Sequence, residues 1–106
     1  MDNQHRKISG DRELSQAEID LMNEIEAFAP QLEALCNKVK AHVAAQITAA
    51  NTAQFDSETP EEEAAASAEV GRLALANPQM WADWGKGSFQ GALMYLTRAV
   101  AQPSFF

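Results

Sequence analysis

The feature that most constrains this chain is a heptad pattern of apolar residues between positions 15 and 50. The apolar positions follow one another in steps of three and four residues, which is the spacing of one face of a coiled-coil helix. They are Met22, Ile25, Ala29, Leu32, Cys36, Val39 and Val43, with Leu21, Phe28, Leu35 and Ile47 beside them. At about 1.5 Å per residue, a helix over this span is about 54 Å long. We therefore expect an elongated, all-α protein.

Capping signals mark where this helix begins. Ser15 and Glu18 have the spacing of a capping box, and Leu14 and Ile19 occupy the positions of a hydrophobic staple across it. Pro30 lies inside the pattern and costs about 3 kcal/mol in a helix interior. Because the apolar pattern keeps its phase on both sides of Pro30, we expect a kink there. The alternative is a short turn, with Pro30 as the first residue of a new helix.

Two further helix starts follow. Thr59 and Pro60 form a cap followed by proline at the first helical position, and three glutamates at 61–63 favour the positive end of the helix dipole. The alanine-rich run after them has little to bury, so we interpret it as a peripheral extension. Asn77 and Pro78 repeat the cap-plus-proline pattern and open the final helix.

The final helix has an apolar stripe that we expect to lie antiparallel on the first helix. This helix carries the large apolar residues Trp81, Trp84, Phe89, Leu93, Leu96 and Val100. Three glycines, Gly85, Gly87 and Gly91, each weaken a helix by about 1 kcal/mol relative to alanine. Either two helices approach closely at these glycines, or the glycines leave room for a ligand beside Trp84.

These boundaries predict one helical-hairpin domain over residues 1–106. Its parts are an arm (1–14), a first long helix (15–50), a turn (51–59), a second helical arm (60–102) and a tail (103–106). A two-helix hairpin has no closed interior, so its apolar seams are expected to be buried by oligomerisation. For the same reason, Phe105 and Phe106 are expected to pack on a neighbouring subunit.

Composition excludes several classes of function. The net charge of −7 disfavours nonspecific DNA binding, which needs clustered Lys and Arg. The single cysteine, Cys36, is expected to be a buried thiol in a reducing cytosol. No signal peptide and no run of about 20 apolar residues is present, so we expect a cytoplasmic protein without a membrane span. No catalytic triad, HExxH or CxxC pattern occurs, which predicts neither an enzyme nor a bound metal or cofactor.

The arm is locally basic in an acidic chain. Arg6, Lys7 and Arg12 are three of the eight Lys and Arg residues, and His5 lies beside them. Gly10 gives the backbone a freedom that other residues lack. The arm is therefore either a solvated segment or an anion-contacting loop laid against the first helix.

Two separated stretches resemble a known family. The start reads QHRKISGDRELS over 4–15 and continues with EIDLMNEI over 18–25, and the end reads TRAVAQPSFF over 97–106. Both stretches are similar to the phage anti-CBASS helical hairpins, nucleotide sponges whose hairpin is shared with an anti-Thoeris sponge. The resemblance covers roughly 4–46 and 81–106. It implies a hexamer that binds a cyclic di- or trinucleotide, or a related second messenger, at subunit interfaces without cleaving it. Such a protein would act in the cytoplasm of an infected bacterial host and support immune evasion.

At two positions the chain departs from the family pattern. Asp11 stands where the family motif usually has a tyrosine that stacks on a base, and Glu26 stands where a lysine often contacts phosphate. The resemblance and the charge pattern together suggest a set of ligand-binding residues. The set comprises Arg6, Lys7, Gly10, Asp11, Arg12, Glu26, Lys86 and Arg98. In it, the carboxylates would accept hydrogen bonds from sugar hydroxyls or base amino groups, and the cations would neutralise phosphates.

Two functional hypotheses remain open. The first is a nucleotide sponge, supported by the basic arm and the terminal stretch. The second is a coiled-coil hairpin that kept the fold as a structural or protein-binding module and lost the ligand, supported by Asp11 and Glu26.

Overall fold

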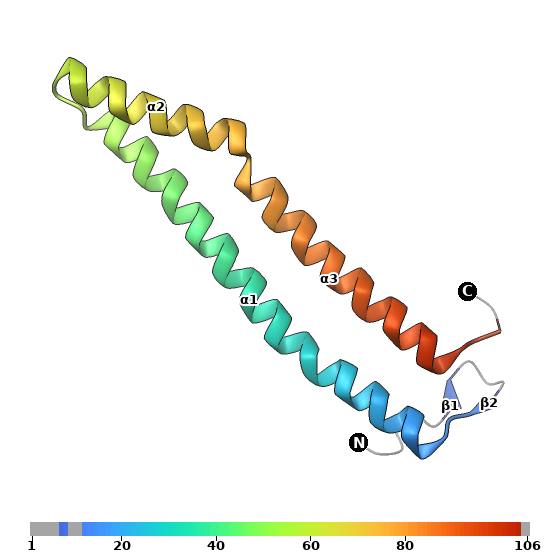
Figure 1. Ribbon diagram of the computed structural model, residues 1–106. Coiled ribbons are helices and arrows are strands. Elements are labelled where there is room, and N and C mark those ends of the chain that lie inside the picture. The colour runs from blue at the N-terminus through green and yellow to red at the C-terminus, as the bar shows by residue number, and fades with distance from the viewer. Residues whose placement is uncertain (1–6, 9–11, 105–106) are drawn as a thin grey trace. The chain divides into compact units, whose positions relative to one another are not determined.

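The helices and strands come from a computed structural model that describes residues 7–8 and 12–104 (Figure 1). The elements are β1 (Lys7–Ile8), β2 (Arg12–Glu13), α1 (Gln16–Phe55), α2 (Pro60–Ala76) and α3 (Pro78–Ala101). The expected all-α class is thus confirmed for the body of the protein. The arm adds an antiparallel ladder in which Lys7 pairs with Glu13 and Ile8 with Arg12. Strands of two residues are too short to show an alternating sequence pattern, so this ladder was not anticipated.

Helix α1 is longer than the sequence indicated. It runs for 40 residues with Pro30 inside it, so the alternative in which a new helix starts at Pro30 is wrong. It also continues past residue 50 to Phe55, and the turn shrinks from the expected 51–59 to 56–59. Residues 51–55 are mostly polar but include no proline or glycine to stop a helix. The hydroxyl of Ser57 then donates to the carbonyl of Gln54 at 2.9 Å and satisfies one of the free acceptors at the helix end.

The chain divides into two compact units, and α1 and α3 each contribute to both. The first unit consists of Met1–Ala34 and Lys86–Phe106, and the second of Leu35–Gly85. In the first unit, the start of α1 packs against the end of α3. The core there is formed by Leu14, Ile19, Met22 and Ala101, with Val100 packed against them. Ile19 is completely buried and Leu14 is 2% exposed, so this small cluster is closed to solvent.

The predicted cap at the start of α1 is confirmed. The backbone N–H of Glu18 donates to the hydroxyl of Ser15 at 3.2 Å, and the Ser15 N–H donates to the Glu18 carboxylate at 2.7 Å. Leu14 and Ile19, the predicted staple, both belong to the buried cluster. The cap and the staple together hold the end of the arm against the first turn of α1.

The second unit is a hairpin of α1 and α2, followed by the first turns of α3. As predicted, Thr59 caps α2, its hydroxyl accepting from the Glu62 N–H at 3.1 Å. Helix α2 buries Ala66 and Leu73, so this alanine-rich segment packs on its own chain more fully than its composition suggested. The amide of Gln54 on α1 also donates to the hydroxyl of Ser67 on α2 at 3.0 Å.

The break between α2 and α3 lies where Asn77 and Pro78 predicted it, but Asn77 acts differently from the expected N-cap. Its backbone is left-handed, with φ 47° and ψ 54°, and its N–H donates to the carbonyl of Leu73 at 2.9 Å. This is the C-terminal capping conformation, which asparagine adopts more easily than most residues. The Asn77 side chain donates to the sulfur of Met80 at 3.5 Å and caps no backbone group. The residue therefore ends α2, and Pro78 begins α3 (Figure 1).

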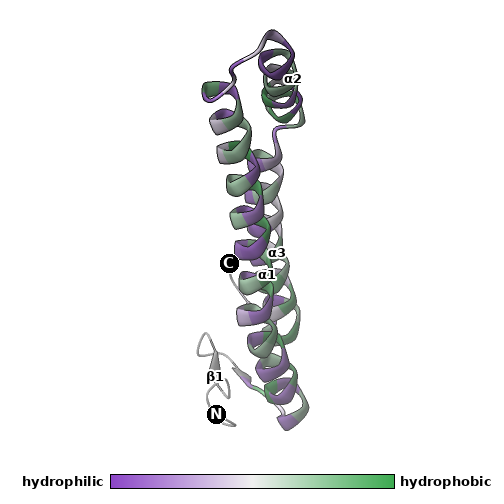
Figure 2. Cartoon of the chain, turned by 90° about the vertical axis from the view of Figure 1, so that its left-hand side faces the viewer, coloured by the Kyte–Doolittle hydropathy of each residue, from purple (hydrophilic) through white to green (hydrophobic). Residues whose placement is uncertain are grey.

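The heptad seam of α1 is only partly buried within the chain. Met22, Cys36 and Val43 are buried as expected, whereas Val39 is 44% exposed. On α3, Leu93 and Val100 are half-buried, but Leu96 is 54% exposed. Hydrophobic and hydrophilic residues alternate along the helices in Figure 2, as amphipathic helices require. A single chain therefore leaves part of each predicted stripe in contact with solvent.

Candidate functional site

Five of the eight predicted ligand-binding residues are described by the structure, and all five lie in the first unit. Lys7 lies on β1, Arg12 on β2, Glu26 on α1, and Lys86 and Arg98 on α3. All five belong to the unit built from both ends of the chain. The other three candidates, Arg6, Gly10 and Asp11, lie outside the residues that the structure describes. The two sequence stretches that carry the family resemblance thus contribute to one compact body.

Strand pairing, a buried leucine and the helix cap attach the basic arm to α1. Arg12 is the ladder partner of Ile8 and lies two residues before Leu14, which is 2% exposed. Between Leu14 and the helix, the Ser15–Glu18 capping box fixes the direction in which the chain enters α1. The backbone of Arg12 is therefore anchored on both sides, by the ladder and by the buried leucine.

The helical candidates differ in exposure. Glu26 on α1 and Lys86 on α3 are half-buried, and Arg98 is exposed in the last turn of α3. Glu26 and Arg98 each take part in an interaction within the chain. A cation in the last turn also complements the negative end of the helix dipole, so Arg98 has a structural role besides any contact with a ligand.

The structure adds one residue that the sequence analysis did not assign, Asn23. Its side-chain oxygen is buried and has no hydrogen-bond partner within the described part of the chain. Buried acceptors are almost always satisfied, so an orphaned one calls for a donor from outside the chain or from water. Asn23 precedes Glu26 by one helical turn, which places two acceptors on neighbouring parts of one face of α1. In the sequence, the only feature that could have indicated this acceptor was the position of an amide side chain directly after the seam residue Met22.

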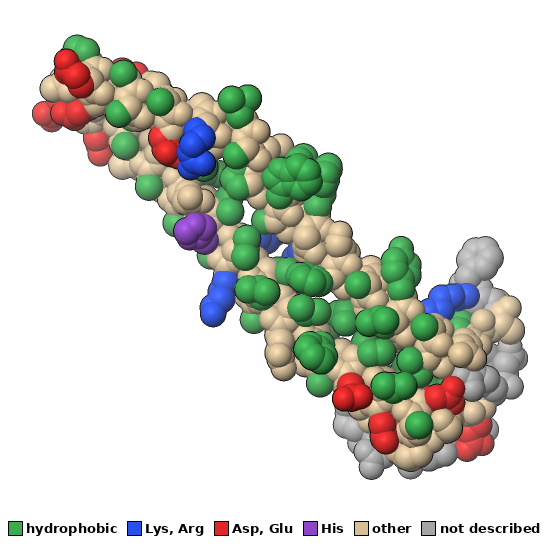
Figure 3. All heavy atoms as spheres, viewed as in Figure 1, with side chains coloured by type: hydrophobic (Ala, Val, Ile, Leu, Met, Phe, Trp, Pro, Cys, Tyr) green, Lys and Arg blue, Asp and Glu red, His purple; other side chains and the backbone are tan. Residues whose placement is uncertain are grey.

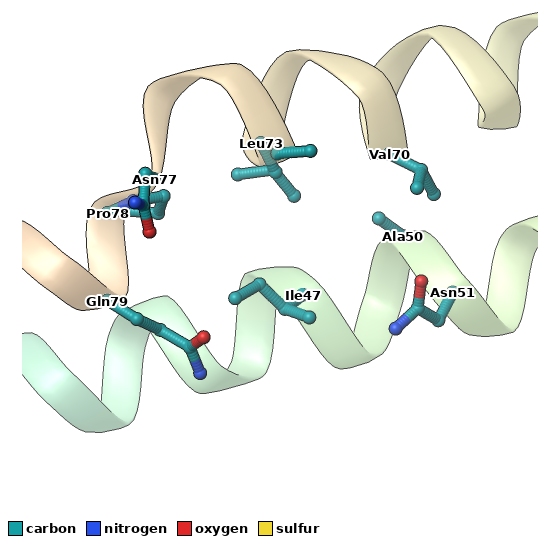
Figure 4. Close-up of a pocket in the computed structure, with 9 residues that line it drawn as sticks. Ile47, Ala50, Asn51, Val70, Leu73, Asn77, Pro78 and Gln79 are labelled. Carbon is teal, nitrogen blue, oxygen red and sulfur yellow. The ribbon is translucent and has the colours of Figure 1, made fainter.

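The hollows described in the second unit suit an anionic ligand poorly. The smallest, about 190 Å³, lies between α1 and the α2–α3 junction (Figure 4). Ile47 and Ala50 of α1 lie on one side of it and Leu73 of α2 on the other, and the side-chain amides of Asn51 and Gln79 also line it. Ligand pockets usually measure about 300–1,000 Å³, so this hollow is too small for a cyclic oligonucleotide.

Two larger hollows in the second unit contain cations, but each of these cations is already paired with a carboxylate. One, of about 520 Å³, includes Lys40, but that ammonium is paired with Asp83 at 3.1 Å. The other, of about 730 Å³, is lined by alanines and by the carboxylates of Asp56, Glu62 and Glu69. Its single cation, Arg72, forms an ion pair with Glu69, and the hydrogen bond from Arg72 holds the pKa of Glu69 below its usual value. Neither hollow therefore offers a free cation to a phosphate.

The glycines of α3 are not explained by packing within the chain. A Cβ added at Gly85 or Gly87 would meet no atom within 4 Å, and one at Gly91 would meet only the Tyr95 ring, at 3.9 Å. Close approach to α1 is therefore not the reason for these glycines. Trp81 and Trp84 lie nearby with their rings edge to face, 5.2 Å apart, and both are more than half exposed.

Among residues 7–8 and 12–104, no group of three or more His, Cys, Asp or Glu is placed to hold a metal ion. Within this part of the chain, no helix combines the length and apolar character needed to cross a bilayer.

Comparison with known proteins agrees with the resemblance seen at the two ends. No protein-family model matches the sequence. The chain is, however, 40% identical over 105 residues to a protein of Pseudomonas phage JBD67 named anti-CBASS protein 2, and the match covers 97% of both chains. Identity at this level over nearly the whole length extends through the alanine-rich middle, which was not diagnostic by itself. The chain belongs to the anti-CBASS protein 2 family.

Proposed function

We propose that this protein captures a cyclic oligonucleotide, or a related nucleotide second messenger, and so blocks CBASS signalling in the infected host. The family membership supports the anti-CBASS role, because the phage relative carries that name. The observation that carries the binding step is the buried, unpartnered oxygen of Asn23 in the same unit as the basic arm. A base amino group or a sugar hydroxyl carries the donor that this acceptor lacks.

The chemistry of the first unit fits a ligand that has both phosphates and hydrogen-bond donors. Lys7 and Arg12 of the arm, together with Lys86 or Arg98 of α3, supply cations for phosphodiester oxygens. Asn23 and Glu26 supply acceptors on α1. A nucleotide carries both kinds of group, whereas a simple anion such as sulfate has no donor for Asn23.

The ligand is captured without being cleaved. The protein is proposed to act as a homo-oligomer, of hexameric type, in which the site lies at a subunit interface and the ligand is released intact. Large exposed side chains support self-association: in the first unit, Phe28 is 57% and Leu96 54% exposed. Apolar side chains gather along the visible face of the helices in Figure 3, and patches of this kind mark interaction surfaces.

The experiment is calorimetric titration of the protein with a panel of cyclic di- and trinucleotides, followed by denaturation and chromatography of the ligand. We expect at least one member of the panel to bind and to be recovered unchanged. Arg12→Ala should weaken binding, because a charge-assisted hydrogen bond contributes about 1.5–3 kcal/mol. Asn23→Leu should weaken it as well, since the ligand loses an acceptor.

Arg72→Ala is the matched control for Arg12→Ala. It removes the same charge from the second unit, where the guanidinium is paired with Glu69, and it should leave binding unchanged. Equal losses in both variants would point to net charge and not to a site. Linear products in the chromatogram would refute capture without cleavage.

A second candidate function is a coiled-coil module that binds protein and has lost the ligand. The exposed apolar side chains and the carboxylates at positions 11 and 26 favour it. Arg12→Ala separates the two functions. If that change dissociates the oligomer, the arm is an assembly strap and the module is favoured; if the oligomer mass is kept and binding is lost, capture is favoured.

A further inference from the structure

One hollow of the second unit, of about 730 Å³, is a groove between α1 and α2 that nucleotide capture does not use. Five alanines line this hairpin groove: Ala49, Ala50 and Ala53 from α1, and Ala65 and Ala66 from α2. Ala50 and Ala66 are only 6% and 7% exposed, whereas the other three are exposed. Because both walls carry small side chains, the groove leaves room for the larger side chains of a third helix.

The two walls of the hairpin groove have the same spacing and the same length. The lining positions run from Gln46 to Asp56 on α1 and from Glu62 to Arg72 on α2, each in steps of three, one, three and three residues. Helical periodicity places such positions on one face of each helix. Each wall is therefore three turns, or about 15 Å, long. A helix of similar length would contact both walls along their whole extent.

The hairpin groove is acidic at the end where α1 turns into α2. Residues 56–63 contain no Lys, Arg or His, and their five carboxylates are those of Asp56, Glu58, Glu61, Glu62 and Glu63. Figure 3 shows Asp and Glu side chains gathered at this end of the hairpin. Asp56 and Glu62 line the groove itself, and in the described part of the chain neither forms an ion pair. The groove therefore combines an apolar lining with negative charge that is not neutralised.

We propose that the hairpin groove docks a basic amphipathic helix of another protein. The apolar face of that helix, about three turns long, packs on the alanines. Lys or Arg side chains beside this face contact the carboxylates of Asp56 and Glu62. This is recognition of a helix in a groove, in which the partner supplies large apolar anchors at helical spacing. Here the anchors fill a hollow that alanines leave open.

Charge selects the class of partner. The chain has a net charge of −7, so a second copy approaches the acidic end of the groove with like charge overall. The same carboxylates repel the phosphates of nucleic acids. A basic helix is attracted instead, and complementary charge raises both the rate of encounter and the specificity of the contact.

This inference goes beyond nucleotide capture and does not depend on it. The residues of the hairpin groove all belong to the second unit, whereas the candidate nucleotide site lies in the first. Failure of either proposal therefore leaves the other standing.

The first test uses a synthetic peptide as the partner. The peptide has leucines at helical spacing over three turns and lysines beside them, and fluorescence anisotropy measures its binding to the unaltered protein. A control peptide has the same composition in an order without an apolar face. We expect saturable binding of the amphipathic peptide, at least about tenfold tighter than that of the control, as the burial of one leucine predicts. Equal binding of both peptides, or of neither, would overturn the proposal.

The second test locates the contact with two leucine substitutions. Ala53→Leu fills the hairpin groove, and Ala64→Leu adds the same side chain to α2 about 200° around the helix from Glu62. Both alanines are exposed and leucine is a good helix former, so both variants should fold, which circular dichroism checks. We expect Ala53→Leu to weaken peptide binding about tenfold and Ala64→Leu to leave it unchanged. Equal affinities for the two variants would overturn the location.

The third test separates the groove from the general negative charge. Glu62→Gln and Glu61→Gln remove the same charge from one turn of α2, but only Glu62 lines the groove. We expect a loss of peptide affinity of up to about fivefold for Glu62→Gln alone. Equal losses would show attraction to net charge and overturn the docking site. Sedimentation velocity should give Ala53→Leu the mass of the unaltered protein; a smaller mass would assign the groove to a contact between copies and overturn the proposal.

Discussion

Ser15 and Glu18 cap the first turn of α1 reciprocally, through hydrogen bonds of 2.7 Å and 3.2 Å between the backbone of each and the side chain of the other. The capping box lies directly after Leu14, which is 2% exposed. These three residues therefore start the helix and attach the arm to it. This coupling makes the cap a structural support of the candidate site as well as a helix boundary.

Removal of either helix cap should destabilise the protein. Ser15→Ala and Thr59→Ala should each lower the free energy of unfolding by about 1 kcal/mol, because a backbone N–H loses its partner. The two caps lie in different units and share no partner, so the double variant should show the sum within about 0.5 kcal/mol. Urea unfolding followed by circular dichroism, at one fixed protein concentration, measures all three variants. No loss for Ser15→Ala would show that the capping box does not hold α1.

The departures at positions 11 and 26 should weaken the binding of cyclic dinucleotides. Asp11→Tyr together with Glu26→Lys restores the residues that the resemblance implies, an aromatic ring and a cation. Stacking on a base contributes about 1–3 kcal/mol, which corresponds to roughly 5–150-fold in the dissociation constant. Calorimetry should therefore show tighter binding of cyclic GMP–AMP by the double variant. Tight binding by the unaltered protein would contradict this interpretation of both carboxylates.

A charge at Val39 should disturb assembly. Val39 belongs to the predicted seam but is 44% exposed in the single chain, so we expect another subunit to cover it. Val39→Asp would then bury an unpaired carboxylate, which costs several kcal/mol. Asn37→Asp adds the same charge on the opposite side of α1 and serves as the control. Light scattering should report a smaller mass only for Val39→Asp; equal masses for the two variants would place Val39 outside any interface.

The Glu69–Arg72 pair should make a small contribution to stability that depends on pH. Its hydrogen bond with Arg72 lowers the pKa of Glu69 from the usual value of 4.5. A carboxylate with a lowered pKa stabilises the folded state above its unfolded pKa, and this contribution disappears as pH falls through the folded value. Both side chains are exposed, so screening limits the size of the effect. Thermal unfolding of the unaltered protein and of Glu69→Gln should differ at pH 7 and converge as the pH falls below the lowered pKa of Glu69; a constant difference would contradict the pairing.

Local signals in the sequence determined the helix starts of this protein. The side chains at Ser15, Glu18 and Thr59 bond to backbone groups within three residues, so their spacing was sufficient to predict both caps. The heptad spacing likewise predicted one long helix through Pro30, and the apolar pattern that crosses that proline was the reason to expect no break. The resemblance of the two ends predicted the family, which the phage relative confirms.

Tertiary structure decided what no local pattern contains. The antiparallel ladder between β1 and β2 is too short for a periodic signal, and α1 extends to Phe55 because a polar sequence alone does not end a helix. Only the fold shows that Asn77 adopts a left-handed backbone and closes α2, since its side chain fits an N-cap and a C-cap equally well. The buried oxygen of Asn23 also became visible only when both ends of the chain were placed in one unit. Burial depends on which distant segments cover a residue, and in this protein those segments lie at opposite ends of the sequence.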